Sequence, residues 1–561
     1  MSKVVIYSSR KRKSKSKNIM RAIDKVISTT NMLFVVTLVS LCNSSAWAQE
    51  RPNILLIIAD DLGYGDLGVY GGDINTPNID ALANSGQLFT QFHTAPTCAV
   101  TRAMLFSGNN NNVAGLAVQG GSSGPVIPGL AGYENVLSDR VALLPQLLQD
   151  VGYRTYIAGK WHLGEEIGHL PKAAGFRQSY VMSFGAGNHF NNVGFRPGGG
   201  SVYWDGDEQV SWPDGGYSTE VYTNKLLEYL ETDKDSDEPF FMVAAYTSPH
   251  WPLQVPEDEL DLYSGRYDMG YDVLREQRFA SLKSSGIIPP ESQLPPRNGA
   301  ITLWNELSPE QQRNESRKME LYAAMVDNLD GHVGRLIEYL RTNNLYDNTL
   351  IVFMADNGAA GEDFYNTGPY VNNVRSLYNN SYENMGKPDS WVAYGPQWAE
   401  AGSAPFKRYK GFTTEGGIIA PMIVTGPGVN GETRISDTYI AVPDLTQTFL
   451  ELAGGAYPDD KEPMIGESAW PYITGAAESV HDDNYVTVLT QSQRAYVRQG
   501  DWKLVSIDRP FDERNFKLHN LKSDPGEAID LSESNPEKRI NLIKIWREKR
   551  REYGIVLPED L

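Results

Sequence analysis

Residues 54–61 read ILLIIADD, a continuous apolar run that ends at two aspartates. An apolar run of this length, without alternating polar residues, is typical of a strand that is buried on both faces of a sheet. In open α/β sheets, ligands bind beyond the carboxyl ends of the strands. The run therefore predicts a central strand, and its two carboxylates mark a candidate site at the end of that strand.

Strand and helix patterns alternate from this run towards the C-terminus. The alternation predicts an α/β fold with a parallel-type sheet that helices cover on both faces. The expected strands are residues 51–60, 153–158, 240–245 and 349–354, and the expected helices are residues 77–85, 141–151, 218–230 and 318–340.

The C-terminal region has a different pattern, which is typical of an antiparallel meander with a helix packed on it. A composition shift near residues 454–460 separates it from the preceding chain. We predict a main N-terminal domain at residues 49–455 and a subdomain, a four-stranded antiparallel sheet plus a helix, at residues 456–561. The expected strands are residues 485–489, 495–498, 502–506 and 516–519, and the helix is 535–553.

Residues 1–48 have the layout of a secretory signal peptide. A basic lead precedes an apolar stretch at residues 32–42, and Ala46-Trp47-Ala48 offers a small-x-small cleavage site. The apolar stretch is short for a membrane span. We therefore expect a protein that is exported to the periplasm or secreted, without membrane attachment after cleavage.

The mature chain is strongly acidic. The whole sequence carries a net charge of −20, and the leader carries nine basic residues and one acidic residue, so residues 49–561 carry −28. Such a field argues against nucleic acid or an anionic membrane as a partner. An anionic substrate would therefore need a local basic pocket.

A second predicted strand also ends in oxygen-bearing side chains. Asp356 and Asn357 follow the strand at residues 349–354, as Asp60 and Asp61 follow the first strand. Three carboxylates and one amide are hard oxygen ligands that suit Ca²⁺ or Mg²⁺. Each motif alone is usually an ordinary turn, but their joint position at two strand ends favours a metal site.

Lysine and histidine side chains lie near the ends of two further strands. Lys160 and His162 follow the strand at residues 153–158, His250 follows the strand at residues 240–245, and Lys410 opens a glycine-rich segment. Taken singly, such residues are more often structural or solvated. Together at the edge that carries the expected metal ligands, they would neutralise an anionic ester and the charge that develops on it.

Cys98 is the only cysteine outside the leader, so it has no internal disulfide partner in an exported chain. A free cysteine is ordinarily a small buried hydrophobe. The alternative is a nucleophile, or the precursor of one, at the start of a helix with Arg102 one turn along on the same face. The oxygen ligands, histidines and lysines favour this alternative.

These motifs, in this order, resemble the sulfatase family of the alkaline phosphatase-like superfamily, over essentially the whole mature chain. Segments 132–134, 185–189 and 409–413 are most similar to bacterial arylsulfatases, which accept aryl and alkyl sulfate esters. The resemblance implies a large mixed sheet flanked by helices, with a smaller C-terminal antiparallel sheet plus a helix. It rests on residues 52–54, 60–66, 98–108, 152–155, 159–164, 249–252, 356–358, 410–417, 498–504 and 521–527.

The resemblance further implies calcium-dependent hydrolysis of aryl, alkyl or carbohydrate sulfate esters in the N-terminal domain, with release of inorganic sulfate. Cys98 would be oxidised to formylglycine, whose hydrated aldehyde attacks sulfur and later expels sulfate. The ligands of one Ca²⁺ would be an oxygen of residue 98 together with Asp60, Asp61, Asp356 and Asn357.

The other site residues receive their roles from the same resemblance. Arg102 would hold the hydroxyl of the nucleophile, Lys160 would grip the sulfate, and His162 would orient the hydrate and act as the base for elimination. His250 and Lys410 would bind the bridging oxygen and protonate the leaving alcohol, which sulfate ester hydrolysis requires.

One position departs from the family pattern, because Val100 stands where the maturation motif has proline. The formylglycine-installing enzyme, a partner during maturation, reads that proline and Arg102 before the chain folds. Two alternatives to an active sulfatase stay open. One is a phosphodiesterase or phosphonate monoester hydrolase of the same superfamily, and the other is a catalytically impaired relative that binds sulfate esters. The complete set of site residues argues against the impaired relative.

Three segments, residues 184–205, 254–307 and 361–403, are expected to form the rim of the pocket, because specificity resides on loops. Their aromatic rings are candidates for stacking on an aryl group or a sugar, and packing within the loops is an equally good interpretation. These rings are Phe190, Trp204, Tyr365, Tyr370, Trp391 and Trp398.

Overall fold

The computed structural model describes Met1, residues 51–119, 129–431 and 434–557, and Asp560. Apart from Met1, the predicted signal peptide lies outside the described residues. Pro52–Leu561 form one compact unit. Among the described residues, no helix combines the length and the apolar character that a membrane crossing needs.

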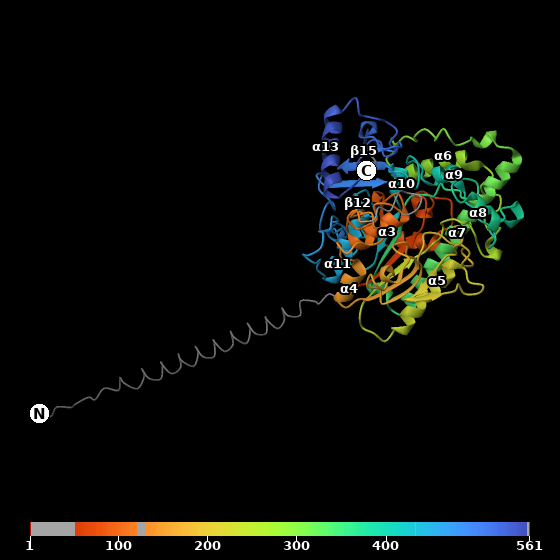
Figure 1. Cartoon of the computed structure of the whole chain (residues 1–561). Helices are drawn as coiled ribbons and strands as arrows, with labels where there is room; N and C mark the ends of the chain where they lie inside the picture. The colour runs from red at the N-terminus through yellow and green to blue at the C-terminus, as the bar shows by residue number, and fades with distance from the viewer. Residues whose placement is uncertain (2–50, 120–128, 432–433, 558–559, 561) are drawn as a thin grey trace. The chain divides into compact units, whose positions relative to one another are not determined.

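A ten-stranded mixed sheet lies at the centre of this unit, in the order β11-β2-β10-β9-β1-β8-β4-β5-β6-β7 (Figure 1). The strands from β9 to β5 run parallel. Antiparallel pairs join β10 to β2 and β9, and β6 to β5 and β7. The mixed sheet implied by the resemblance is confirmed, whereas the parallel-type sheet expected from the alternation holds for the central strands and for the edge pair of β11 and β2.

The strand bounds agree with the apolar runs of the sequence. All seven residues of β1 are buried, as its uninterrupted apolar pattern predicts. The strands of this sheet are β1 (Asn53–Ala59), β2 (Gln87–Phe89), β4 (Arg154–Lys160), β5 (Gln178–Met182), β6 (Tyr203–Asp205), β7 (Glu208–Val210), β8 (Phe240–Ala245), β9 (Thr349–Ala355), β10 (Met422–Thr425) and β11 (Ile435–Ser436). A separate two-stranded sheet joins β3 (Phe92–His93) to β12 (Ile440–Ala441).

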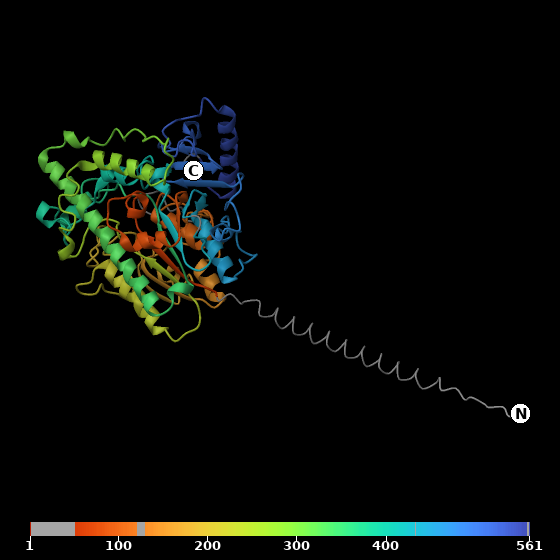
Figure 2. The ribbon, with the colours of Figure 1, turned by 180° about the vertical axis from the view of Figure 1, so that it is seen from behind.

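Helices cover both faces of the large sheet. α2 (Pro77–Asn84) and α5 (Ser218–Thr232) pack with the long α7 (Pro309–Thr342) on one face, and the opposite face carries α3 (Cys98–Ser107), α4 (Leu144–Asp150) and α11 (Val442–Ala453) (Figures 1 and 2). The remaining helices include α6 (Gly270–Ser284), α8 (Val371–Leu377), α9 (Gly395–Gly402), α10 (Glu415–Ile418) and α12 (Trp470–Ile473).

The helix expected at residues 318–340 begins nine residues earlier, at Pro309. The reason is a capping box that the apolar periodicity does not contain. The Ser308 hydroxyl accepts a hydrogen bond from the Gln311 amide at 3.3 Å, and the Gln311 side chain accepts one from the Ser308 amide at 2.8 Å. These two bonds satisfy amide groups that a helix start otherwise leaves unpaired.

The C-terminal sheet consists of β13 (Val486–Gln491), β14 (Arg494–Gln499), β15 (Trp502–Ser506) and β16 (Lys517–Asn520), all antiparallel. α13 (Pro536–Glu552) packs on this sheet through its buried Leu542 and Trp546. The predicted sheet plus helix is confirmed, and the domain boundary near residue 455 stays a prediction.

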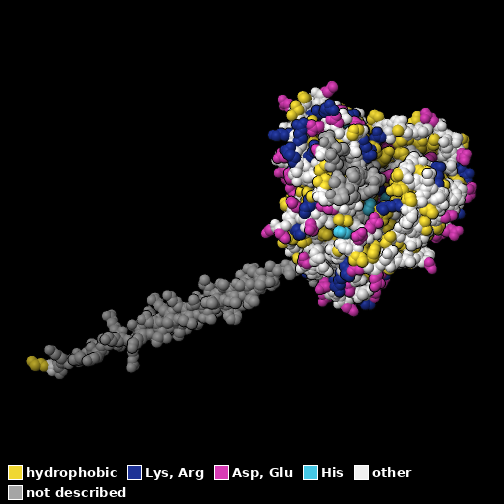
Figure 3. Space-filling model, in the orientation of Figure 1, with side chains coloured by type: hydrophobic (Ala, Val, Ile, Leu, Met, Phe, Trp, Pro, Cys, Tyr) yellow, Lys and Arg dark blue, Asp and Glu magenta, His cyan; other side chains and the backbone are white. Residues whose placement is uncertain are grey.

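Charge is unevenly distributed over this acidic protein. In Figure 3, basic side chains gather at the upper left, over the C-terminal sheet and α13, and acidic side chains are spread over the other visible surface. The basic residues of α13 are Lys538, Arg539, Lys544, Arg547, Lys549, Arg550 and Arg551.

A buried charge network joins the C-terminal sheet to α10. Lys503 of β15 is 2.6 Å from a carboxylate oxygen of Glu415 and 2.9 Å from one of Glu527. Nε2 of His93 lies 2.6 Å from the other oxygen of Glu415. Burial alone would raise the pKa of Glu415, but Lys503 and His93 outweigh burial and hold that pKa well below its usual range. The positive charge of Lys503 therefore compensates the buried carboxylates of both Glu415 and Glu527.

We predict that Lys503→Met lowers the free energy of unfolding by about 3–5 kcal/mol, because it leaves two carboxylates buried without their cation. The urea midpoint of the full-length chain measures the change. Lys517→Met, at an exposed position of β16, is the matched control and changes stability by at most about 0.5 kcal/mol. Equal losses in the two variants would contradict the role assigned to Lys503.

The pH dependence of this difference has a defined sign. Because the folded pKa of Glu415 is depressed, its stabilising contribution is complete above the unfolded pKa of about 4.3 and is lost as pH falls towards the folded value. The stability difference between the wild type and Lys503→Met should therefore shrink below about pH 4.3.

Candidate active site

The carboxyl ends of four adjacent parallel strands meet at one edge of the large sheet. Ala59 of β1 pairs in register with Ala355 of β9, so the residues that follow these strands are neighbours. β8 lies beside β1, and β4 lies beside β8. In the order β9, β1, β8 and β4, these strands carry Asp356 and Asn357, Asp60 and Asp61, His250, and Lys160.

Cys98 is the first residue of α3 and is fully buried against this edge. Its Sγ lies 3.3 Å from Oδ1 of Asp60 and 3.8 Å from Oδ1 of Asp61. Burial, with the carboxylates of Asp356 and Asp60 close by, raises the pKa of the Cys98 thiol well above its usual range. The unmodified thiol is therefore protonated at neutral pH and a poor nucleophile.

Lysine and histidine side chains face the two carboxylates that follow β1. Nζ of Lys160 is 2.6 Å from Oδ2 of Asp60, and Nζ of Lys410 is 2.7 Å from Oδ1 of Asp61. Nε2 of His250 is 3.3 Å from Oδ2 of Asp61. Burial opposes the charge of Lys410, but Asp61 and the other acidic groups nearby together outweigh burial and raise the pKa of that lysine. Lys410 is therefore a protonated group in a buried site.

Arg102, one turn along α3 from Cys98, connects α3 to Asp356 after β9 and to Lys160 at the end of β4. Its Nε and Nη2 donate to Oδ2 of Asp356 at 3.1 and 2.9 Å, and its Nη1 donates to the Lys160 carbonyl at 2.6 Å. Oδ1 of Asp356 accepts a hydrogen bond from the Asp61 amide at 3.3 Å. The arginine thus fixes the ends of β4 and β9 against the helix that begins at Cys98.

Four side chains at this edge could together hold a metal ion. Asp60, Asp61, Cys98 and His250 offer ligand atoms that all lie within 4.8 Å of one another. The amide of Asn357 donates to Oδ1 of Asp61 at 2.6 Å, while its own Oδ1 is buried without a hydrogen-bond partner. Burial and the carboxylate of Asp356 raise the pKa of Asp60 to about 7, although Lys160 lowers it, as expected for clustered buried carboxylates. Oxygen-rich sites of this kind suit Ca²⁺ or Mg²⁺.

His162 and Asp61 both adopt a left-handed backbone conformation, with φ values of 62° and 68°. Residues other than glycine rarely take this conformation, and such strain concentrates at functional sites. Burial and neighbouring cations, Lys160 foremost for His162 and Lys410 foremost for His250, lower the pKa of both imidazoles well below its usual value. Both histidines are therefore neutral and able to accept protons at pH 7.

A cavity of about 820 Å³ opens onto this edge and is lined by His162, His250 and Lys410. Of the expected rim segments, residues 184–205 and 361–403 contribute Phe184, Phe195, Arg196, Glu362, Phe364 and Tyr370 to its lining.

The expectation that residues 254–307 form part of the rim is wrong. No residue of this segment lines the cavity, because the segment folds into η3 (Glu257–Glu259), α6 and η4 (Trp304–Glu306), and α6 packs against α9. Of the aromatic candidates, Tyr370 lines the cavity, whereas Trp391 and Trp398 are fully buried in apolar clusters. Packing is the correct interpretation for these two tryptophans.

The sequence reasoning did not single out several charged and polar residues of the cavity, among them Glu362, Ser492, Arg494 and Arg509. Glu362 lies beside Lys410, which partly offsets the effect of burial, yet burial still raises the pKa of this glutamate. Ser492, Arg494 and Arg509 come from the C-terminal sheet and its loops. No local motif distinguishes them, because only the packing of the C-terminal sheet brings them to the cavity.

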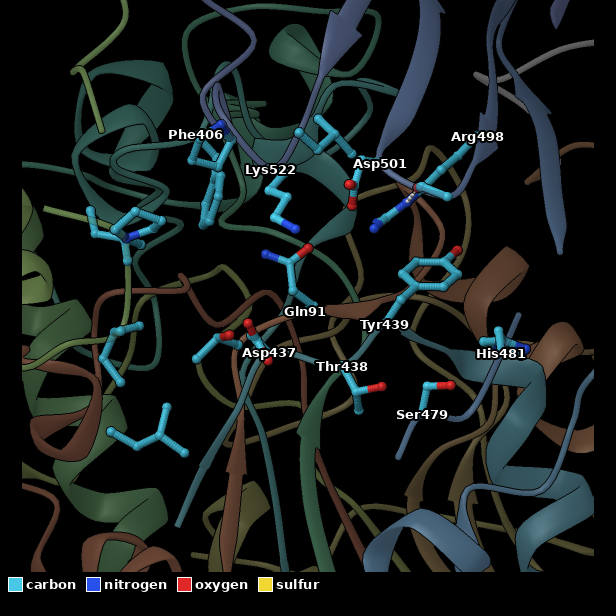
Figure 4. A pocket seen from close by; sticks show the side chains of 18 of the residues that line it. Gln91, Phe406, Asp437, Thr438, Tyr439, Ser479, His481, Arg498, Asp501 and Lys522 are labelled. Carbon is cyan, nitrogen blue, oxygen red and sulfur yellow. Dashed lines mark hydrogen bonds between the residues drawn. The ribbon is translucent and has the colours of Figure 1, made fainter. Parts of the chain in front are cut away.

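A second cavity, of about 750 Å³, lies between the C-terminal sheet and the loops around β11 and β12 (Figure 4). It contains none of the predicted site residues. Basic and acidic side chains occur together in it, with Arg498 and Lys522 near Asp437 and Asp501. The guanidinium of Arg498 stacks on Tyr439, with Cζ 3.8 Å from the ring centroid.

Comparisons with known proteins agree with this site. A profile described as Sulfatase matches residues 52–456. An uncharacterised sulfatase of Schizosaccharomyces pombe is 37% identical over 538 residues, which cover 91% of this chain and 96% of that protein. An arylsulfatase of Klebsiella aerogenes is 37% identical over 473 residues, which cover 83% of this chain and 99% of that protein.

The fold is shared with solved structures. Ps i-CgsB in complex with k-i-k-neocarrahexaose superposes with a TM-score of 0.64 at 24% identity, over 90% of this chain and 93% of that one. The sequence match extends through every residue of the strand-end site, from Asp60 to Lys410. The chain therefore belongs to the sulfatase family, a family of sulfuric ester hydrolases.

Proposed function

We propose that this protein is an exported, calcium-dependent sulfatase that uses a formylglycine derived from Cys98 to hydrolyse aryl, alkyl or carbohydrate sulfate esters. The observation that carries the proposal is the position of Cys98, at a helix start and 3.3 Å from Asp60, among buried cations suited to an anionic ester. The arylsulfatase of Klebsiella aerogenes supports the reaction. The neocarrahexaose bound to Ps i-CgsB supports a carbohydrate ester.

The proposed reaction uses two groups besides the unmodified side chains. When residue 98 carries a hydrated aldehyde, one hydroxyl serves as the nucleophile and the other allows sulfate to leave. A Ca²⁺ ion held by residue 98 together with Asp60, Asp61, Asp356 and Asn357 would neutralise charge on the sulfate.

The surrounding side chains position residue 98, bind the sulfate and transfer protons. Arg102 holds Asp356 and the end of β4, which fixes the start of α3 where residue 98 lies. Lys160 binds the sulfate, and the neutral His162 accepts the proton from the second hydroxyl. His250 and the protonated Lys410 face the bridging oxygen, and Lys410 delivers a proton to the leaving alcohol. These roles need neutral histidines, which can accept protons, beside a protonated lysine, which can donate one.

We further propose the course of maturation. The signal peptide at residues 1–48 directs export, and a formylglycine-installing enzyme modifies Cys98 before folding, since the folded chain buries that residue completely. The catalytic domain would be residues 49–455 and the C-terminal subdomain residues 456–561.

The reaction class is tested by a direct comparison of sulfur and phosphorus esters. Purified protein should hydrolyse 4-nitrophenyl sulfate with a kcat/KM above that for bis(4-nitrophenyl) phosphate and 4-nitrophenyl phenylphosphonate. Lys410→Met should lower kcat for the sulfate ester by about 10²–10⁴-fold, because it removes the proton donor. A preference for either phosphorus ester would instead establish the phosphodiesterase or phosphonate monoester hydrolase alternative.

The state of residue 98 is tested by mass spectrometry of its peptide, from protein made with the maturation machinery. We expect an aldehyde fraction that rises in Val100→Pro. Val100 lies in the first turn of α3, where proline is tolerated because the amide has no intrahelical acceptor. Val100→Ala is the control for loss of the side chain and should not raise the fraction. A thiol without any aldehyde, in protein that releases no sulfate, would establish the impaired relative.

Calcium is tested without relying on activity. Ca²⁺ added to chelator-treated protein should raise the thermal unfolding midpoint, because a ligand that binds only the folded state stabilises it. Asn357→Ala, which removes a buried oxygen without a partner, should reduce this shift, and Mg²⁺ at the same concentration should give a smaller one. A midpoint that does not respond to Ca²⁺ would remove the calcium proposal.

A further inference from the structure

Two arginines of the C-terminal subdomain form part of the wall of the active-site cavity. Arg494 is the first residue of β14, and Arg509 lies in the loop that follows β15. Both line the same cavity as His162 and Lys410. The catalytic cavity is therefore closed on one side by cations that do not belong to the strand-end site.

The Arg494 guanidinium is held in place by neutral groups. It donates to the carbonyl oxygens of Gly411 and Ile507, the second at 3.3 Å. It also stacks on Phe412, with Cζ 3.9 Å from the ring centroid. Gly411 and Phe412 directly follow Lys410, so Arg494 is fixed beside the segment that supplies a predicted catalytic lysine.

In the part of the chain that the structure describes, no carboxylate forms an ion pair with Arg494 or Arg509. By contrast, Arg514 and Arg547 of the same subdomain each pair with an acidic side chain. Burial and the nearby Arg509 lower the pKa of Arg494 to about 10, and burial lowers that of Arg509. Two adjacent cations without an anion are unusual in a chain with a net charge of −20.

The second cavity beneath the same sheet provides a comparison. There, Arg498 and Lys522 share the lining with Asp437, Asp482, Asp483 and Asp501 (Figure 4). Positive charge in that cavity is balanced by the protein itself. The active-site cavity also has acidic residues in its lining, namely Glu134, Glu165, Glu166 and Glu362. Glu134 and Glu165 pair with Arg140 and Arg196, and Glu362 lies beside Lys410. Within the described residues, none of these glutamates pairs with Arg494 or Arg509, so the charge of these two arginines is available to an anionic group of a ligand.

We propose that Arg494 and Arg509 form a second anion subsite, which binds a carboxylate or a further sulfate of the substrate while the scissile sulfate lies at the strand ends. The proposal rests on the proposed sulfatase function and narrows it to esters that carry two or more anionic groups, such as acidic glycans. A cavity of about 820 Å³ has room for more than a simple aryl sulfate. Guanidinium groups bind carboxylate and sulfate oxygens through paired hydrogen bonds.

The test uses ligands that the enzyme does not cleave, so it does not depend on turnover. Binding of α,ω-alkanedisulfonates of increasing chain length, and of the matching ω-sulfoalkanoates, is measured by calorimetry against alkanesulfonates of equal length. The full-length wild type should bind one chain length of dianion about tenfold more tightly than its monoanion, as one charge-assisted contact allows. The disulfonate and sulfoalkanoate series distinguish a sulfate from a carboxylate as the preferred second group.

Arg509→Gln is the decisive variant, because no hydrogen bond within the described chain depends on its side chain. It should abolish the preference for the dianion and leave the affinity for the monoanion within about twofold. Arg494→Lys, which keeps the charge, should retain part of the preference. Lys522→Gln removes the same charge from the second cavity and is the matched control, with the preference intact.

Three results would overturn the subsite. These are a wild type without preference at any chain length, a preference that survives in Arg509→Gln, or an equal loss in Lys522→Gln. Failure of the sulfatase function is recognised separately, because a wild type that releases no sulfate from any ester can still show the dianion preference and lose it in Arg509→Gln.

Discussion

Three carboxylates are buried at the ends of two adjoining strands, and the architecture of the site follows from the need to balance their charge. Asp60, Asp61 and Asp356 are each at most 1% exposed. An ionised carboxylate buried without a partner costs several kcal/mol, so cations must converge on this edge. Arg102 joins α3 to the ends of β4 and β9, and Lys410 brings the glycine-rich segment onto Asp61. The same charged groups are the ones that the proposed function assigns to a metal ion and to an anionic ester.

The C-terminal sheet is part of this arrangement. Lys410 and Glu415 lie in the same glycine-rich segment, and Lys503 of β15 forms an ion pair with Glu415. The sheet therefore anchors the segment that carries Lys410, and it also supplies Arg494 and Arg509 to the cavity wall. Under the proposed anion subsite, this sheet would contribute to the choice of substrate as well as to stability.

Prediction from the sequence succeeded for charged side chains that directly follow a buried strand. The apolar run before Asp60, and the equivalent run before Asp356, predicted that the central strands bring these carboxylates together, because parallel neighbours end at one edge. It failed for residues 254–307, whose helices pack away from the cavity. It could not find Arg494 or Arg509, since an arginine on a short antiparallel strand has no local signal that separates a binding role from a solvated one.

The sequence by itself determined the α/β class, the central strands, the C-terminal sheet with its helix, and the family to which the chain belongs. These features depend on local periodicity and on motifs in a fixed order. Only the tertiary structure decided which cations pair with which carboxylates, which aromatic rings pack and which line the cavity, and that the C-terminal sheet closes one wall. Those outcomes depend on distances between segments hundreds of residues apart, such as the 2.7 Å contact of Lys410 with Asp61, and no local pattern encodes them.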